Sequence, residues 1–309
     1  MENYLIAMCV SAGIYALMAL GVNVVWGFAG MVNLGLVGFF AVGAYTSALL
    51  TLKAGWSIAA GMGAAVIVAA IVGALVALIT VRLRGDYLAI VTLGFAETIR
   101  IVASNAIWLT NGTDGLSGIP GPGRGRVSPE MFNLVYLAIV GVIVAIAYVV
   151  NERLRSSPFG RVLRAVRDDE QIAAVAGKHV TLFKVKAFAI SSAALGLAGA
   201  LYAHYTSYIA PDIFVPLLTL YIKLALLAGG LGNNRGAIVG AFAVVFLLES
   251  TRFVIPYIPG ITPVQGAAIR EFLIASFLLV MLRYKPTGLV PETSTRLPVP
   301  PAARYQPTA

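Results

Sequence analysis

Residues 152–186 read ERLRSSPFGRVLRAVRDDEQIAAVAGKHVTLFKVK, and they form the longest run of the chain that cannot lie in hydrocarbon. The run carries eight basic and four acidic residues, and apolar segments flank it on both sides. Basic loops between membrane spans stay on the cytoplasmic side, by the positive-inside rule. This basic loop therefore predicts the topology, and it is the only sizeable internal surface that the chain offers to a cytoplasmic partner.

The composition is typical of a polytopic membrane protein. Of 309 residues, 59% are hydrophobic and 11% are charged, and the mean hydropathy is +0.89. A soluble domain carries about 25% charged residues. Because a backbone in lipid must satisfy its own hydrogen bonds, the alternatives are a helix bundle and a closed barrel. Long apolar runs without alternation favour helices, and the 32 glycines suit close helix packing.

Charge and cysteine content disfavour several other classes. The net charge of +9 does not indicate nucleic-acid binding, because the bases gather in loops beside apolar spans, where topology and anionic lipid explain them. The single cysteine, Cys9, excludes an intrachain disulfide. His179 and His204 stand too far apart to suggest a metal site. The N-terminus lacks the basic region of a signal peptide, so we expect the first span to be retained.

Hydropathy predicts an all-α, polytopic transmembrane bundle of about nine spans. We expect them at residues 4–25, 34–52, 58–81, 87–109, 132–150, 183–209, two within 217–248, and 264–282. The two spans within 217–248 are separated by GGLGNNRG at 229–236, where a re-entrant hairpin also fits. The predicted membrane domain is 1–284, with its cytoplasmic loop at 151–182. The Pro-rich tail, 285–309, is expected to be disordered and cytoplasmic.

This span count predicts an N-terminus outside and a C-terminus inside. With the basic loop inside, the bases on the inner side outnumber those on the outer side roughly threefold, as the positive-inside rule requires. The Gly/Pro-rich segment 110–129 then becomes a structured outer loop without helical period.

The basic loop contains a predicted amphipathic helix. Ser157 and Pro158 are typical of a helix start, residues 161–176 alternate arginines with apolar positions, and Gly177 is a C-cap signal. Such a helix can seat in the groove of a partner protein or lie on the membrane face against anionic lipid. Periodicity alone leaves both interpretations open.

Polar residues inside the spans are candidates for a translocation path. Glu97 and Arg100 stand three apart on one helix, so they can pair, and each intramembrane charge costs about 2.5–3.5 kcal/mol. The pair lines a path or fixes helix packing. Thr92 is expected to form an interhelical hydrogen bond. Lys223 can line the path, extend toward the membrane surface or pair with an acid such as Glu249.

No ATP site is visible in the sequence. TNGTDGLSG at 110–118 and GGLGNNRG at 229–236 are rich in glycine, but neither contains Gly-Lys-Ser/Thr. If transport is driven by ATP, hydrolysis therefore occurs on another subunit.

Five blocks in order resemble the LivM-type permeases of branched-chain amino acid ABC importers. They lie at residues 82–100, 110–121, 161–203, 229–241 and 283–289, and they read RLRGDYLAIVTLGFAETIR, TNGTDGLSGIPG, RVLRAVRDDEQIAAVAGKHVTLFKVKAFAISSAALGLAGALYA, GGLGNNRGAIVGA and RYKPTGL. The resemblance covers most of the chain. It departs from the family at Tyr221 and Lys223, near which the family tends to carry an acidic residue.

The resemblance implies that the basic loop carries a coupling helix that docks on an ATPase subunit. Glu170, Ala173, Ala174 and Gly177 fall where the family has its Glu-Ala-Ala…Gly pattern, with a spacing that departs from the strict importer consensus. The other candidate coupling residues precede them in the chain: Gly160, Arg161, Arg164, Ala165 and Arg167.

The implied function is that of a permease subunit in a bacterial inner membrane, working by alternating access, and not an enzyme. Its implied partners are a LivH-like permease, two ABC ATPase subunits that hold ATP and Mg²⁺, and an extracytoplasmic binding protein; no cofactor is expected on this chain. The substrate could be a branched-chain amino acid, another amino acid, an amide or urea. The alternative is an ion-driven secondary transporter, which predicts a symmetric pair of broken helices where the sequence indicates one break.

Overall fold

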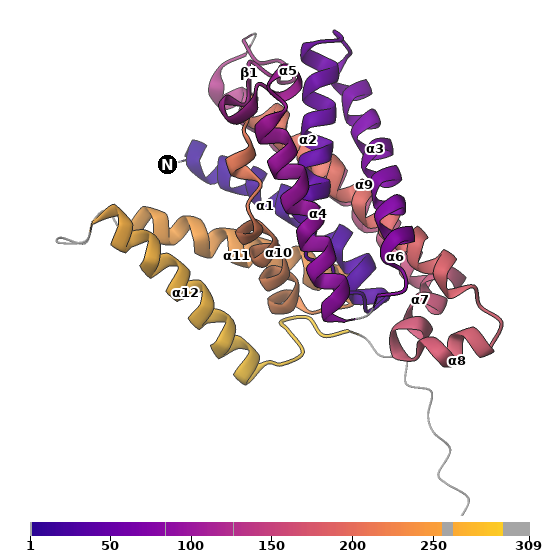
Figure 1. Cartoon of the computed structure of the whole chain (residues 1–309). Coiled ribbons are helices and arrows are strands. Elements are labelled where there is room, and N and C mark those ends of the chain that lie inside the picture. Colours follow the sequence, from indigo (N-terminus) through magenta and orange to yellow (C-terminus); the bar gives the residue numbers. More distant parts are fainter. Residues whose placement is uncertain (1, 84, 126, 255–261, 293–309) are drawn as a thin grey trace, which may run out of the picture.

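The computed structural model describes residues 2–83, 85–125, 127–254 and 262–292, and these are almost entirely helical (Figure 1). Eight of the described helices are long and apolar enough to cross a membrane, and a ninth apolar helix, α2, is shorter. The apolar helices are α1 (Glu2–Val22), which a π-helix η1 (Asn23–Phe28) continues, α2 (Leu36–Leu52), α3 (Ile58–Thr80), α4 (Asp86–Asn105), α6 (Pro129–Ser156), α9 (Val180–Thr206), α10 (Pro216–Gly229), α11 (Asn234–Val254) and α12 (Pro263–Tyr284). The all-α bundle predicted from hydropathy is confirmed, and residues on either side of the 229–236 interruption form two helices.

Short elements complete the chain. They are α5 (Ile107–Thr110), η2 (Gly112–Asp114), β1 (Leu116–Ser117), α7 (Pro158–Asp168), α8 (Glu170–Val175), β2 (Tyr208–Ile209) and η3 (Pro211–Ile213). The strands β1 and β2 pair antiparallel, with Leu116 opposite Ile209. This pairing gives the Gly/Pro-rich segment after α5 a defined structure.

Successive apolar helices run in alternating directions between two polar faces. On one face, the Tyr4 hydroxyl donates to Glu249 at 2.6 Å, which joins the start of α1 to the end of α11. On the other face, Asn234 Nδ2 donates to Glu152 Oε2 at 2.9 Å, which joins the start of α11 to the end of α6. We call the face with α7 and α8 the basic face and the face with β1 and β2 the hairpin face (Figure 1).

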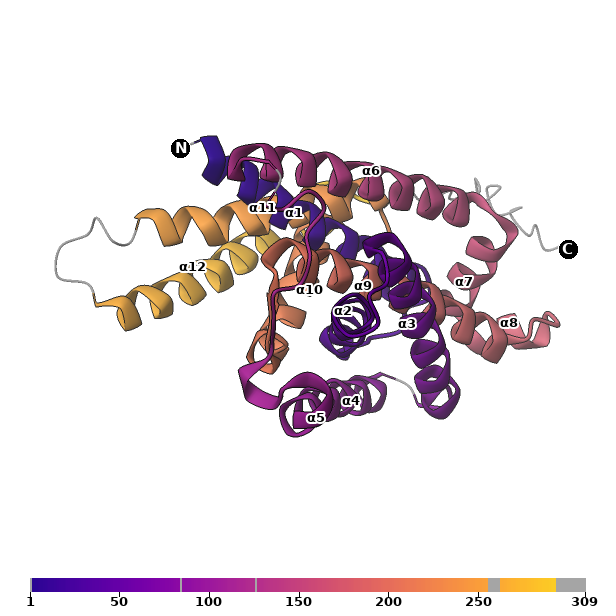
Figure 2. The same ribbon diagram turned by 90° about the horizontal axis from the view of Figure 1, so that it is seen from above.

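The helix α9 packs closely against α2 and α3 at the centre of the bundle (Figure 2). On α3, the buried small residues recur every fourth position, at Gly61, Ala65, Ala69, Gly73 and Ala77. Small residues of this kind let helix backbones approach each other in a membrane protein. The sequence feature that positions these helices is therefore the spacing of glycine and alanine rather than a stripe of large apolar side chains.

The basic loop differs from its prediction in one respect. A single helix was expected over residues 161–176, but Asp169 breaks the segment into α7 and α8, with a φ of −155°. The Asp169 carboxylate accepts hydrogen bonds from the backbone N–H groups of Gln171 and Ile172, at 2.8 and 3.0 Å. Aspartate favours such an N-cap over a helix interior, which explains the break.

The predicted ends of the helical segment are confirmed. Ser157 caps α7 by accepting from the N–H of Gly160 at 3.2 Å, and Pro158 occupies the first turn. Gly177 has a φ of +76° and follows α8. The N–H of Lys178 bonds the carbonyl of Ala173 at 3.2 Å, which is the pattern of a glycine-terminated helix.

Residues 285–292, at the beginning of the tail for which we expect disorder, lie against the end of α10. The N–H groups of Leu289 and Val290 donate to the carbonyls of Ala228 and Gly229, at 2.9 and 2.8 Å. Residues 285–292, here called the strap, therefore satisfy carbonyls at the end of α10. The remaining tail, 293–309, lies outside the described residues.

Candidate functional site

The basic face carries α7 and α8 as an amphipathic pair. Leu163 is fully buried, and Val166, Ala173 and Val180 pack together beneath the pair. Lys184 of α9 forms an ion pair with Glu170 at 2.8 Å, and only 7% of the Lys184 side chain is exposed. Apolar packing and one buried ion pair thus attach α7 and α8 to the bundle.

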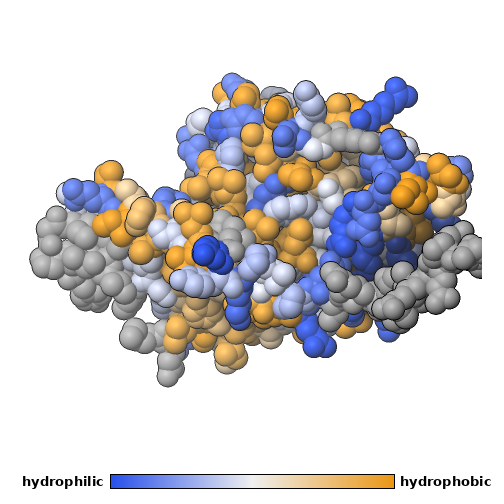
Figure 3. Space-filling view, turned by 90° about the horizontal axis from the view of Figure 1, so that it is seen from below, coloured by the Kyte–Doolittle hydropathy of each residue, from blue (hydrophilic) through white to orange (hydrophobic). Residues whose placement is uncertain are grey.

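The outer side of the pair exposes apolar side chains. Ile172 is 68% exposed and Val175 is 90% exposed. A groove of about 550 Å³ runs between α7 and α8. Its apolar lining includes Val162, Ala165, Ile172 and Ala176, and its charged lining is Arg161, Lys178, Asp168 and Asp169. Figure 3 looks onto the basic face and shows hydrophilic side chains gathered toward the side where α7 and α8 lie. An apolar groove with charged neighbours is a surface suited to a protein partner.

The structure separates the candidate coupling residues into two groups. The exposed ones are Arg161, Ala165, Ala174 and Gly177, whereas Gly160 and Ala173 are buried and Arg164, Arg167 and Glu170 are half-buried. At Gly160 an added Cβ would lie 2.2 Å from the carbonyl oxygen of Leu154, so this glycine permits the tight junction of α6 with α7. The exposed group offers the most surface to a partner, whereas Gly160 and Ala173 are buried within the loop.

The two half-buried arginines point toward the bundle. Arg164 donates to the carbonyl of Arg155 at 3.1 Å, and its burial lowers the pKa of the guanidinium. Arg167 donates to the carbonyl of Gly27 at 2.6 Å and to Glu292 at 3.0 Å. These two side chains attach α7 to α6, to η1 and to the strap.

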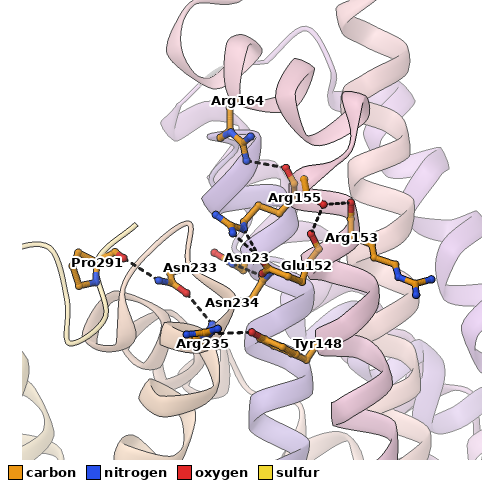
Figure 4. Close-up of polar contacts among 11 residues, drawn as sticks. Asn23, Tyr148, Glu152, Arg153, Arg155, Arg164, Asn233, Asn234, Arg235 and Pro291 are labelled. Atoms are coloured by element: carbon orange, nitrogen blue, oxygen red, sulfur yellow. Dashed lines mark hydrogen bonds and ion pairs between the residues drawn. The ribbon is translucent and has the colours of Figure 1, made fainter. Parts of the chain in front are cut away.

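A polar network that the sequence did not reveal lies beneath the basic loop (Figure 4). Asn234 donates to Glu152 at 2.9 Å and accepts from Asn23 at 3.0 Å, and Asn23 in turn accepts from the N–H of Gly232 at 2.9 Å. Glu152 also pairs with Arg155 at 2.5 Å. The network joins η1, the end of α6 and the turn between α10 and α11. Its only sequence signal was the Asn-Asn pair within GGLGNNRG, which we interpreted as a turn.

Glu97 and Arg100 pair as their spacing predicts. Arg100 Nε lies 3.0 Å from both carboxylate oxygens of Glu97. The pair occupies the middle turns of α4, and 36% of the Glu97 side chain and 29% of the Arg100 side chain are exposed. The pair is therefore directed away from the core of this chain.

Thr92 and Lys223 occupy buried positions. Thr92 accepts a hydrogen bond from the N–H of Leu34 at 3.0 Å. Leu34 lies in the loop before α2, so this bond joins α4 to a loop and is not the interhelical bond that we expected. Thr219, one turn before Lys223, donates to the Leu34 carbonyl at 3.3 Å. Leu34 therefore bonds both α4, through Thr92, and α10, through Thr219.

The Lys223 ammonium lies 4.8 Å from the centre of the Trp26 ring, and 8% of the residue is exposed. Among the described residues no carboxylate forms an ion pair with it. Glu249, the partner considered from the sequence, accepts from Tyr4. Lys223 is thus a buried cation held by an aromatic ring.

A bundle of apolar helices with an amphipathic helix pair on one polar face defines a polytopic membrane protein. Comparison with known families refines this class. The family described as "Branched-chain amino acid transport system / permease component" matches residues 4–282. The chain belongs to this family.

Individual relatives agree with the family match. The LivM permease proteins of the high-affinity branched-chain amino acid transport systems of Salmonella typhimurium and Escherichia coli K12 are each 32% identical over 92% of this chain and 69% of their own length. A probable LivM protein of Methanocaldococcus jannaschii is 33% identical over 91% of both chains. A LivH permease protein of Salmonella typhimurium is 24% identical over 89% of this chain and 91% of its own. No solved structure matches.

Proposed function

We propose that the chain is the membrane-spanning permease subunit of an ATP-driven ABC importer for branched-chain or related small amino acids. The observation that carries this proposal is the family match over residues 4–282, combined with an exposed amphipathic helix pair on the basic face. The family match favours the importer over an ion-driven secondary transporter.

The basic face is cytoplasmic in this proposal. It holds most of the Lys and Arg residues, and positive charge near membrane spans is retained inside. The start of α1 then lies on the outer side of a bacterial inner membrane, and the end of α12 lies on its cytoplasmic side. The hairpin face is consequently the side that meets an extracytoplasmic binding protein.

The outer side of α7 and α8 is the docking surface for an ABC ATPase subunit. Ile172 and Val175 would insert into a partner surface, since exposed apolar side chains of this size gain free energy only when covered. Two such ATPase subunits hold ATP and Mg²⁺. A LivH-like permease supplies the second half of the membrane assembly.

The translocation path runs along the exposed side of α4. Charges in the middle of a spanning helix cost about 2.5–3.5 kcal/mol each in lipid, so Glu97 and Arg100 are expected to face water or protein. Thr92 and Lys223, at 0% and 8% exposed, are buried within this chain, so Glu97 and Arg100 alone are proposed to line this exposed side. Alternating access then follows when ATP draws the two ATPase subunits together and displaces α7 and α8.

A substitution on α8 tests this proposal in the assembled complex. Val175→Glu places a charge in the proposed interface, whereas Gln171→Glu adds the same charge at an exposed position of α8 that is already polar. Ala173 is a poorer choice because it is 4% exposed, so a charge there would disrupt the loop itself.

We expect Val175→Glu to abolish the ATP hydrolysis that loaded binding protein stimulates, while membrane insertion stays normal and Gln171→Glu behaves like the wild type. Unchanged stimulation of ATP hydrolysis in Val175→Glu would contradict the proposal that this side of α8 docks an ATPase subunit. Leucine uptake by the purified chain without any ATPase subunit would contradict the importer itself.

A further inference from the structure

The side chain of Arg167 is the point where three separate segments of the chain meet. Its Nη1 donates both to the Gly27 carbonyl at 2.6 Å and to Glu292 at 3.0 Å, and a quarter of the side chain is exposed. Its stem packs on Gly30, where an added Cβ would lie 2.7 Å from Arg167 Cγ. Arg167 belongs to α7, whereas its partners belong to η1 and to the strap.

The contact with Gly27 ties α7 to the first membrane helix. Gly27 lies near the end of η1, which continues α1 without a break. Carbonyl groups at the end of a helix carry partial negative charge, so a guanidinium is a favourable partner there. A π-helix is an irregular segment that often occurs at functional sites. A displacement of α7 would therefore act on α1 at its irregular end.

The contact with Glu292 ties α7 to the turn between α10 and α11. Glu292 ends the strap, whose Leu289 and Val290 bond the carbonyls at the end of α10. Asn233 Nδ2 also donates to the carbonyl of Pro291 at 2.9 Å. An added Cβ at Gly232 would lie 2.7 Å from the Glu292 carboxyl carbon, so the carboxylate rests on that turn. Glu292 is thus fixed to the turn before it meets Arg167.

We propose that Arg167 and Glu292 form the joint through which the coupling loop moves the membrane helices. Arg167 links α7 at the same time to α1 through Gly27 and to the α10–α11 turn through Glu292. The strap, which the composition predicts to be part of a disordered tail, is a working part of the coupling apparatus. This inference rests on the proposed importer function, and it assigns a positioning role to both residues.

The neighbouring Asp168 supplies a matched control. It lies 3.3 Å from Arg167 Nε, but its side chain is 71% exposed and it belongs to α7 itself. An exposed pair of this kind contributes little, and it links no other segment. Neutralising Asp168 therefore removes a charge beside Arg167 without breaking the joint. Asp168 also lines the groove between α7 and α8, but a loss of docking there would lower ATP hydrolysis and transport together and leave their ratio unchanged.

The test uses the complete complex in proteoliposomes, with leucine and its binding protein as the probe. Arg167→Gln, Glu292→Gln, the double variant and Asp168→Asn are compared for leucine transported per ATP hydrolysed. We expect each joint variant to lower this ratio about fivefold or more, the low end of coupling between linked sites. The double variant should be no worse than Arg167→Gln alone, because Arg167→Gln already breaks the link to Glu292. Asp168→Asn should match the wild type.

Thermal unfolding of each complex separates coupling from mere stability. A lowered transport ratio with an unchanged unfolding temperature supports the joint. Additive losses in the double variant, an unchanged ratio in Glu292→Gln, or a ratio that falls only in parallel with the unfolding temperature would each overturn it. If the wild-type complex shows no ATP-dependent uptake, the proposed function fails instead.

Discussion

At the scale of single residues, Gly199 shows how little room the centre of the bundle has. An added Cβ there would lie 2.0 Å from the carbonyl oxygen of Phe40 on α2. Gly199→Ala should therefore destabilise the protein, by about 1–3 kcal/mol for overpacking of this kind. The measurement is thermal unfolding of the purified protein in detergent.

Gly141→Ala on α6 is the matched control for that experiment. Nothing lies within 4 Å of an added Cβ at Gly141, and the residue is helical, so alanine should leave the unfolding temperature unchanged or raise it slightly. Equal losses at both positions would show that α2 and α9 are not packed as closely as described.

Whether a contact between two residues can be predicted depends on how far apart they lie in the sequence. The pairing of Glu97 with Arg100 is predictable, because residues three apart share a helix face. The bond between Asn23 and Asn234 joins positions 211 apart, and Arg167 and Glu292 are 125 apart. Neither pair has a local pattern, since only the folded bundle brings its members together.

At the scale of elements, Asp169 decides the form of the coupling loop. Its carboxylate caps the six-residue helix α8, and losing an N-cap costs about 1 kcal/mol. Asp169→Ala should therefore increase amide hydrogen exchange over residues 170–176 and weaken ATPase docking. Asp169→Asn, which retains an oxygen acceptor, should restore protection. Equal exchange in the two variants would indicate that charge, rather than the cap, holds α8.

The same element separates what hydropathy predicts from what it misses. A span results from the summed preference of about 20 apolar residues, so its existence is visible in the sequence. The break at Asp169 results from one carboxylate that competes with helical hydrogen bonds, in a segment whose overall pattern predicts one helix. The Ser157 and Gly177 signals mark the outer ends of the segment, and neither bears on an interruption between them.

At the scale of the whole molecule, the strap and the polar network gather the moving parts on one face. The basic loop, the end of η1 and the α10–α11 turn are joined by Arg167, Glu292 and Asn234. The hairpin face is held separately, by the pairing of β1 with β2 and by Lys53, which donates to the carbonyl of Leu109 at 2.8 Å. Motion that enters through α7 therefore reaches several helices at their ends on the basic face, while the hairpin face keeps its own contacts.

The orientation of these two faces in the membrane is open to a direct test. The native Cys9 is first replaced by serine, and single cysteines are then introduced at Lys178, after α8, and at Thr113, in η2; both positions are exposed. Because the basic face is expected to be cytoplasmic, a membrane-impermeant thiol reagent should label the Thr113→Cys protein in intact cells, after passage through any outer membrane. It should label the Lys178→Cys protein only in inverted vesicles. Labelling of Lys178→Cys in intact cells would show that the topology is the reverse of the one proposed. The docking surface on α7 and α8 would then lie outside the cell, where no ATPase subunit could bind it.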